Sequence, residues 1–394
     1  MALQPASGAQ DLLPRDVGAN RWICEQLAAV YNRWGYAEVM PPSLERLDTL
    51  EAGGAIESSQ VLQVVADEPL GLRPEMTASI ARAACTRLAA MPRPLRLHYR
   101  GSTFKAQRIE DQGIRIAEDL QSGVELMGAP GLAGDSELLR LLLDAARGLP
   151  FSADQSPTLL IGHQGLLDLL LSGAPEALQP ALRHVLCALD RVSLKAMDLE
   201  PGLAQRYLAV MDLRGEPHTV LAQLKQMLGS TSSLLHEISQ LVNAIQRQAV
   251  EQGIRLQLDP TFHPDFELYD GVMVKLVCQG LDAPVAIASG GRYDALVQRF
   301  SPDGAVASGV GFSFAVEAVR QLLEQADQLP PRQDGEVVLI TYSQPSQLHP
   351  ALNLLEQLHQ SGQPAELWPE PCANETEAKQ IATQRGVNAV RWVG

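Results

Sequence analysis

The sequence predicts an α+β protein in which an antiparallel sheet is flanked by helices, with a helical insertion and a small C-terminal α/β unit. Three observations carry this prediction. Apolar and polar residues alternate at 95–100 and 119–127, the pattern of strands whose two faces differ. A stretch rich in Leu, Ala and Gln, with helical spacing, covers about 157–253. A proline-containing stretch at 328–335 indicates a linker.

Three parts are therefore expected in this chain of 394 residues: a core at 1–327, the linker at 328–335 and a C-terminal unit at 336–394. Roughly 150 residues per domain agrees with that division. Short apolar runs separated by helical patterns predict a βαβαβ order for the last part. There, Asn374 followed by Glu377 predicts a capping box, and Gly386 predicts the end of the same helix.

The first helix of the core is predicted from apolar residues at helical spacing from Ile23 onward, and we expect it to end at Gly35. A strand is expected next, over 36–42. A second helix is predicted to begin at Pro74, since proline suits the first turn. The last helix of the core is expected over about 314–326.

Polar side chains share a face on two predicted strands. Gln121 and Glu125 lie on the same side of the 119–127 strand, about 13 Å apart, with Gly123 between them. A further strand, predicted over 265–278, places Tyr269 on its polar face. Such faces predict a sheet whose open side lines a pocket. The alternative is that they simply meet water.

Charge and composition exclude several classes of protein. The chain carries 31 Lys plus Arg against 46 Asp plus Glu, a net charge of −15, which counts against nucleic acid as its main ligand. Five scattered cysteines without metal-binding spacing predict no metal site and a reducing, cytoplasmic location. We expect no membrane span and no cofactor, because apolar runs and nucleotide-binding loops are missing.

Seven short segments, in order and at similar spacings, resemble the core of histidyl-tRNA synthetase over roughly residues 5–320. They are 8–14 (GAQDLLP), 35–45 (GYAEVMPPSLE), 73–78 (RPEMTA), 99–108 (YRGSTFKAQR), 121–128 (QSGVELMG), 290–297 (GGRYDALV) and 309–317 (GVGFSFAVE). The resemblance implies a class II aminoacyl-tRNA synthetase-like fold. It also implies a dimer formed through residues 36–45.

Positive charges that the synthetase reaction needs are missing. Forming an aminoacyl adenylate requires cations aimed at the phosphates, and each such contact contributes about 3 kcal/mol. Where the family has arginines, this chain has Lys105, Pro264 and Ala318. Lysine keeps a charge but lacks the planar fork that holds two oxygens. The resemblance therefore implies a protein that does not catalyse adenylation.

The residues that the family uses to bind histidine are present. The resemblance assigns Glu75, Thr77 and Gln121 to the α-ammonium group, and Glu125 and Tyr269 to the imidazole ring. These residue types supply the acceptors and donors that such a ligand requires. Without the resemblance, Glu75 would be interpreted as an acid at a helix N-terminus, Thr77 as a cap and Tyr269 as core packing.

The contact for the ligand's carboxylate is left open. The family's arginine would stand at position 264, and this chain has proline there. Lys105, Arg108 and Arg292 are three possible substitutes, among which the sequence does not choose. No catalytic residue and no metal ligand is predicted.

The C-terminal segment 335–394 carries six acids and three bases, and it resembles a shortened anticodon-binding domain. A net charge of −3 suits RNA phosphates poorly. The whole pattern resembles the regulatory subunit of short-form ATP phosphoribosyltransferase, the first enzyme of histidine biosynthesis. This resemblance implies a non-catalytic chain that binds a separate short catalytic subunit, takes histidine as effector, binds no tRNA and self-associates as a dimer within a hetero-oligomer.

Two alternatives remain. The chain could be a divergent histidyl-tRNA synthetase, or another enzyme that adenylates a carboxylate. It could also be a binding protein without a catalytic partner.

Overall fold

The computed structural model describes residues 5–52, 60–109, 113–228, 232–262, 268–301, 308–330 and 337–394, with side chains at 108–114 left out. The chain divides into two units, 1–329 and 330–394, and each is described by itself. No helix in the described ranges is long and apolar enough to cross a membrane.

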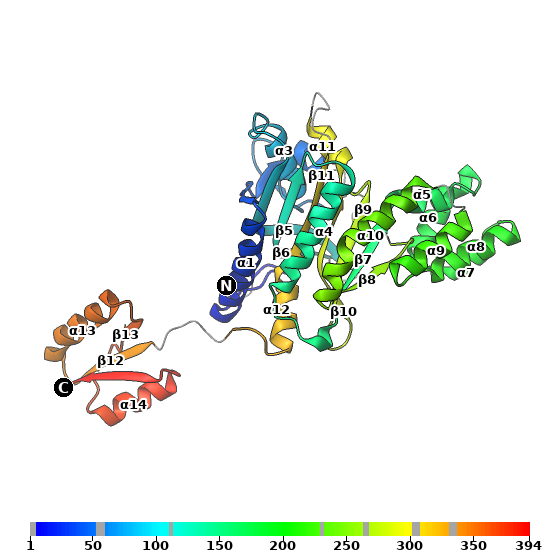
Figure 1. The fold of residues 1–394 in the computed structure, drawn as a ribbon. Helices are drawn as coiled ribbons and strands as arrows, with labels where there is room; N and C mark the ends of the chain where they lie inside the picture. Colours follow the sequence, from blue (N-terminus) through cyan, green and yellow to red (C-terminus); the bar gives the residue numbers. More distant parts are fainter. Residues whose placement is uncertain are drawn as a thin grey trace. The chain divides into compact units, whose positions relative to one another are not determined.

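An eight-stranded sheet forms the centre of the first unit (Figure 1). In sheet order its strands are β1 (Ala37–Glu38), β5 (Leu95–Ile109), β6 (Gly113–Met127), β11 (Gly309–Ala315), β10 (Pro284–Arg292), β9 (Val272–Gln279), β7 (Thr158–His163) and β8 (Arg255–Leu258). The pairs from β5 to β7 are antiparallel, and the two outer pairs, β1 with β5 and β7 with β8, are parallel. The predicted antiparallel sheet is therefore confirmed.

Long helices cover one face of this sheet and enclose the main core. They are α1 (Pro14–Arg33), α4 (Gly131–Arg147), α10 (Ser233–Glu251) and α12 (Val316–Gln325). Apolar side chains from the strands, such as Val124 and Phe314, pack against them. The other face carries a smaller core with α3 (Thr77–Cys85) and α11 (Asp294–Phe300). That second face also holds the candidate site.

The beginning of the chain follows the sequence pattern with one difference. Helix α1 ends at Arg33, and Gly35 then adopts a φ of +78°, which favours glycine. The strand expected over 36–42 is only Ala37–Glu38. Pro41 and Pro42 follow, and proline cannot donate to a sheet ladder. Instead, their carbonyl oxygens accept hydrogen bonds from the buried Arg73 guanidinium, at 2.6 and 3.0 Å.

A second small sheet lies nearby in the sequence, with strands β2 (Leu44–Arg46), β4 (Leu70–Leu72) and β3 (Gln63–Val64) in that order. Helix α2 (Leu47–Ala52) follows β2. Helix α3 begins at Thr77, three residues after the position predicted from Pro74.

The predicted helical insertion is divided between two cores. Helices α5 (Gln164–Leu171), α6 (Gln179–Cys187), α7 (Arg191–Ala196) and α8 (Pro201–Asp212) pack around their own apolar cluster, beyond β7 and β8 in Figure 1. Helices α9 (Pro217–Leu228) and α10 instead pack on the main core, and β7 is a strand of the main sheet. Helical spacing shows that a helix has an apolar face, but not which core that face meets.

Helix α12 begins at Val316, later than expected. Phe314 and Ala315 belong to β11, where they pair with Ser122 and Gln121 of β6. The end of the strand is apolar and continues directly into the helix, so the sequence does not mark the boundary.

The second unit has the predicted βαβαβ order. Strands β12 (Val338–Tyr342), β13 (Ala365–Leu367) and β14 (Ala389–Val393) form a parallel sheet in the order β13-β12-β14, with helices α13 (Leu348–Gln360) and α14 (Glu375–Gln384). The Asn374 side chain accepts a hydrogen bond from Glu377 N at 3.0 Å and caps α14. Gly386, at φ +69°, follows its end. The capping prediction is confirmed.

Candidate ligand-binding site

Glycines make room for polar side chains on the second face of the sheet, the face that carries α3 and α11. Glu125 of β6 is paired with Gly311 of β11, which is paired in turn with Gly291 of β10. A Cβ atom on Gly311 would lie 1.9 Å from Glu125 Oε2, and one on Gly291 would lie 2.7 Å from the Tyr269 ring. At Gly123 it would lie 2.6 Å from Tyr99 Oη. Larger residues would fill the space that these polar side chains occupy.

Glu125 is at the centre of the site and is only 1 % exposed. One carboxyl oxygen accepts a hydrogen bond from Thr77 Oγ1 at 2.9 Å, and the other accepts one from the hydroxyl of Tyr293. Burial raises the pKa of Glu125 to about 8, although both hydrogen bonds favour the charged form. The carboxyl group can therefore hold or release a proton near neutral pH.

Glu75 supports the start of helix α3. Its carboxylate accepts hydrogen bonds from the backbone N–H groups of Thr77 and Ala78, the latter at 2.8 Å. Burial raises the pKa of Glu75, while these bonds and the charge of Lys105 act in the opposite direction. The interpretation of Glu75 as an acid at a helix N-terminus is thus confirmed, and the same contact fixes Thr77 beside Glu125.

Tyrosines surround the two carboxyl groups. Tyr99 of β5 and Tyr293, at the start of α11, are buried, and Tyr269 packs against the smaller core. Burial and the neighbouring charge of Glu125 raise the pKa of all three phenols. The sequence reasoning did not place Tyr99 and Tyr293 in the site. The alternation that puts Tyr99 opposite Gly123 was an available signal.

Gln121 and Tyr269 complete the predicted set. Gln121 lies two positions before Gly123 on the same face of β6, and it is paired with Gly101 of β5. Tyr269 precedes β9 and does not belong to it, because β9 begins at Val272 and the expected strand over 265–278 is shorter than predicted. Residues 263–267, which include Pro264, lie outside the described part of the chain.

The three candidate cations have different surroundings. Lys105 lies on the same face of β5 as Tyr99, and its charge acts on Glu75. Arg108 belongs to the same strand, but its side chain lies outside the described part. Ala318 is one of the three positions at which the synthetases have arginine. It lies in α12, packs against the main core and supplies no charge.

Arg292, considered above as a contact for the ligand's carboxylate, instead forms a buried ion pair with Asp135. Its Nε and Nη2 atoms lie 2.9 and 2.6 Å from Asp135 Oδ1, and its Nη1 atom lies 2.9 Å from Asp294 Oδ1. Nη2 also donates to the carbonyl oxygens of Ala129 and Gly131. This buried ion pair ties β10 to α4. The guanidinium is thus engaged within the fold, which argues against a contact with the ligand's carboxylate.

Metal ligation is not supported by the described residues, among which no group of three or more His, Cys, Asp or Glu side chains could hold an ion. Cys24 and Cys278, both buried, are free thiols, and burial raises their pKa values to about 11 and about 12. The site consists of carboxyl, hydroxyl and amide groups, which suit a small polar molecule carrying its own hydrogen-bond donors.

The comparisons with known proteins agree with this fold. A family model described as histidyl-tRNA synthetase matches residues 8–319. The structure is similar to an ATP phosphoribosyltransferase regulatory subunit/histidyl-tRNA synthetase from Bacillus halodurans, with a TM-score of 0.82, 24 % identity and coverage of 99 % of this chain and 98 % of that one. It is also similar to histidyl-tRNA synthetase from Nostoc sp. PCC 7120, with a TM-score of 0.78, 18 % identity and coverage of 98 % and 90 %. The protein therefore belongs to the histidyl-tRNA synthetase-like proteins, which have the class II synthetase fold.

Curated relatives narrow this class. The ATP phosphoribosyltransferase regulatory subunit of Synechococcus sp. strain RCC307 is 76 % identical over 394 residues, and that of strain WH7803 is 45 % identical over 397 residues. Each match covers 100 % of both chains. This chain belongs to the family of ATP phosphoribosyltransferase regulatory subunits.

Proposed function

We propose that the chain is a non-catalytic regulatory subunit that a separate short catalytic subunit of ATP phosphoribosyltransferase needs for activity, and through which histidine inhibits that activity. The observation that carries the proposal is the hydrogen-bonded set of Glu125, Thr77 and Tyr293 beside Glu75, in which Glu125 and Tyr293 are buried. A hydrogen-bonded carboxyl group of this kind is a recognition element for a ligand that carries nitrogen donors.

Histidine fits the chemistry of this set. Its imidazole ring would meet Glu125 and Tyr269, and its ammonium group would meet Glu75, Thr77 and Gln121. Because burial raises the pKa of Glu125 to about 8, a neutral ring nitrogen can accept the proton of the carboxyl group, or an imidazolium can pair with the carboxylate. Lys105 and Arg108, both on β5, remain the proposed contacts for the ligand's carboxylate.

The loss of adenylation follows from the distribution of cations. A phosphoanhydride reaction needs several positive groups aimed at the phosphates. Lys105 is one cation near the carboxyl groups, Ala318 supplies none, and Arg292 is paired with Asp135. For the same reason of charge, we propose that the acidic C-terminal unit does not bind tRNA.

Self-association is proposed through residues 36–45. Met40 and Leu44, in this segment, expose 74 % and 45 % of their surfaces. Large apolar side chains that are exposed together are typical of protein contacts. We propose a dimer within a hetero-oligomer that also contains the catalytic subunit, located in the cytoplasm.

The direct test is reconstitution. Phosphoribosyltransferase activity of the short catalytic chain is measured with and without this protein, and histidine is then titrated. We expect activity only in the mixture, with inhibition by histidine. Glu125→Ala should weaken the inhibition while leaving the protein folded. No activation by this protein would contradict the proposal.

A second assay addresses the enzymatic alternative. Pyrophosphate exchange into ATP, dependent on histidine, reports adenylation directly. We expect none, together with measurable histidine binding in a calorimeter. Robust exchange would show instead that the chain is a working synthetase.

A further inference from the structure

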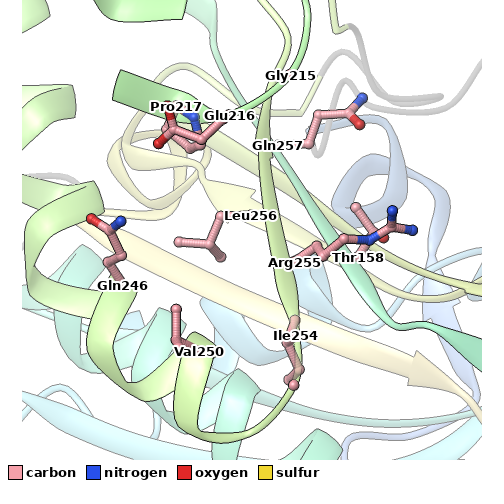
Figure 2. A pocket seen from close by; sticks show the side chains of 11 residues that line it. Thr158, Gly215, Glu216, Pro217, Gln246, Val250, Ile254, Arg255, Leu256 and Gln257 are labelled. Carbon is pink, nitrogen blue, oxygen red and sulfur yellow. The ribbon is translucent and has the colours of Figure 1, made fainter. Parts of the chain in front are cut away.

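The outer edge of the main sheet, at β8, adjoins a cavity of about 570 Å³ that is separate from the site around Glu125 (Figure 2). It lies among β8, the start of α9 and the end of α10. Figure 2 shows Leu256 directed toward Val250 and Gln246 of α10, whereas Arg255 and Gln257 point to the other side of the strand. The cavity is thus bounded by a strand on one side and by a helix on the other.

The main chain of β8 has an open position at this edge. Arg255 N donates to the carbonyl oxygen of Pro157, directly before β7, at 3.0 Å, and Asp259 N donates to that of Ile161 in β7 at 2.9 Å. Alternate residues of a strand direct their backbone groups to opposite sides, so Leu256 and Leu258 face away from β7. Leu258 exchanges two hydrogen bonds with Gly215, at 2.9 and 3.1 Å.

The neighbouring segment turns away before it reaches Leu256. Two residues after Gly215, Pro217 begins helix α9, so within the described ranges the pairing on this side of β8 stops at the single bridge to Gly215. The N–H and C=O groups of Leu256 therefore have no strand partner on this side within the described ranges. An edge of this kind accepts an additional strand.

The side chains around this position combine apolar groups with polar ones and include one cation, Arg255. Val250, on α10, is 72 % exposed, while Ile254 and Pro217 form the inner wall. Arg255 is exposed, and no described acid forms an ion pair with it. The nearby Glu216 is occupied, because its carboxylate accepts hydrogen bonds from the N–H groups of His218 and Thr219 at 3.0 and 2.8 Å.

We propose that this edge is a docking site for the catalytic chain, which adds an extended segment to β8, places an apolar side chain in the cavity and pairs an acidic side chain with Arg255. The inference rests on the proposed function, since it names the surface through which the proposed partner binds. Main-chain pairing supplies affinity in such complexes, and the pocket and the charge supply specificity. The acidic requirement follows from the charge of Arg255, which forms no ion pair with a described acid.

Two variants test the site, with the full-length protein and the catalytic chain. Leu256→Pro removes a donor that faces away from β7, so the sheet ladder stays complete. Arg255→Glu reverses the charge at the rim. Each variant should raise by about tenfold the concentration of this protein that gives half-maximal activation. Activity at saturation should stay unchanged, because neither residue lies near Glu125.

The control variant is Arg247→Glu. Arg247 is an exposed arginine on α10 that lies 3.5 Å from Glu251, outside the cavity lining. It should leave the half-maximal concentration within about twofold of that of the unchanged protein. Hydrogen exchange on unaltered proteins gives a second measurement that does not depend on a variant folding: the Leu256 amide should become protected when the complex forms.

The outcomes separate the two proposals. If the unaltered protein activates the catalytic chain, but Arg255→Glu activates equally well and the Leu256 amide gains no protection, the docking site is wrong and the proposed function stands. If the unaltered protein neither binds nor activates the catalytic chain, both proposals are wrong.

Discussion

Gly311→Ala should disable the site around Glu125 without replacing any residue that would contact a ligand. The added Cβ atom would lie 1.9 Å from Glu125 Oε2 and 2.6 Å from Val124 O. Contacts below 3.0 Å are essentially never made by real Cβ atoms, so the carboxyl group must move by at least about 1.1 Å. Tyr293 and Thr77 hold its two oxygens, and a shift of that size breaks these hydrogen bonds.

The size of the effect follows from the two bonds. Each contributes about 1 kcal/mol net, so the loss of both removes about 2 kcal/mol. If that energy holds Glu125 in its binding position, the Kd for histidine rises about thirtyfold. Isothermal titration calorimetry with histidine measures this change, and thermal unfolding of the same samples shows whether the variant remains folded.

Gly18→Ala is the matched control. Gly18 lies in α1, and a Cβ atom there would meet nothing within 4 Å. This variant should bind histidine as the unaltered protein does, and gain up to about 1 kcal/mol of stability from helix propensity. Histidine affinity in Gly311→Ala within twofold of the unaltered protein would refute the reasoning, because it would mean that the position of Glu125 does not determine binding.

Three further predictions concern stability. Burial raises the pKa of Glu125 from 4.5 to about 8, so the folded protein binds more protons than the unfolded chain between these values. Its free energy of unfolding should therefore fall as the pH rises through that window. Urea titrations at several pH values should show a smaller fall for Glu125→Gln. An equal fall in the free energy of unfolding of both proteins would contradict this. Arg292→Ala leaves Asp135 buried without its cation, and denaturant unfolding should show a loss of about 3–5 kcal/mol, partly restored in the double variant with Asp135→Ala. A loss below 1 kcal/mol would show that the pair is not needed. Asn374→Ala removes the cap of α14 and should cost about 1 kcal/mol, measured by hydrogen exchange in that helix; unchanged exchange would contradict the assigned cap.

Local patterns were sufficient to predict much of the fold. The alternation around Val124 and Leu126 identifies β6 because strand periodicity and burial act on neighbouring residues. The stop of α1 just before Gly35 and the cap at Asn374 were predicted for the same reason, since both depend on short-range geometry. The face shared by Gln121 and Glu125 also follows from period two alone.

Contacts between distant residues could not be predicted in this way. Thr77 and Glu125 are 48 positions apart, Tyr293 and Glu125 are 168 apart, and Arg292 and Asp135 are 157 apart. No local periodicity encodes such pairs, because they depend on the order of strands in the sheet. For this reason Arg292 was considered as a ligand contact on its charge alone, although the fold gives that charge a buried partner.

Arg292 and Tyr293 are consecutive in the chain and serve different neighbours. Arg292 is tied to α4 through Asp135, and Tyr293 holds Glu125 in the site. The acceptor that meets an incoming molecule is consequently set in place beforehand, which lessens the entropy lost when that molecule binds. Substitutions of Asp135, which does not belong to the site around Glu125, should for that reason be detected as weaker ligand affinity as well as lower melting temperature.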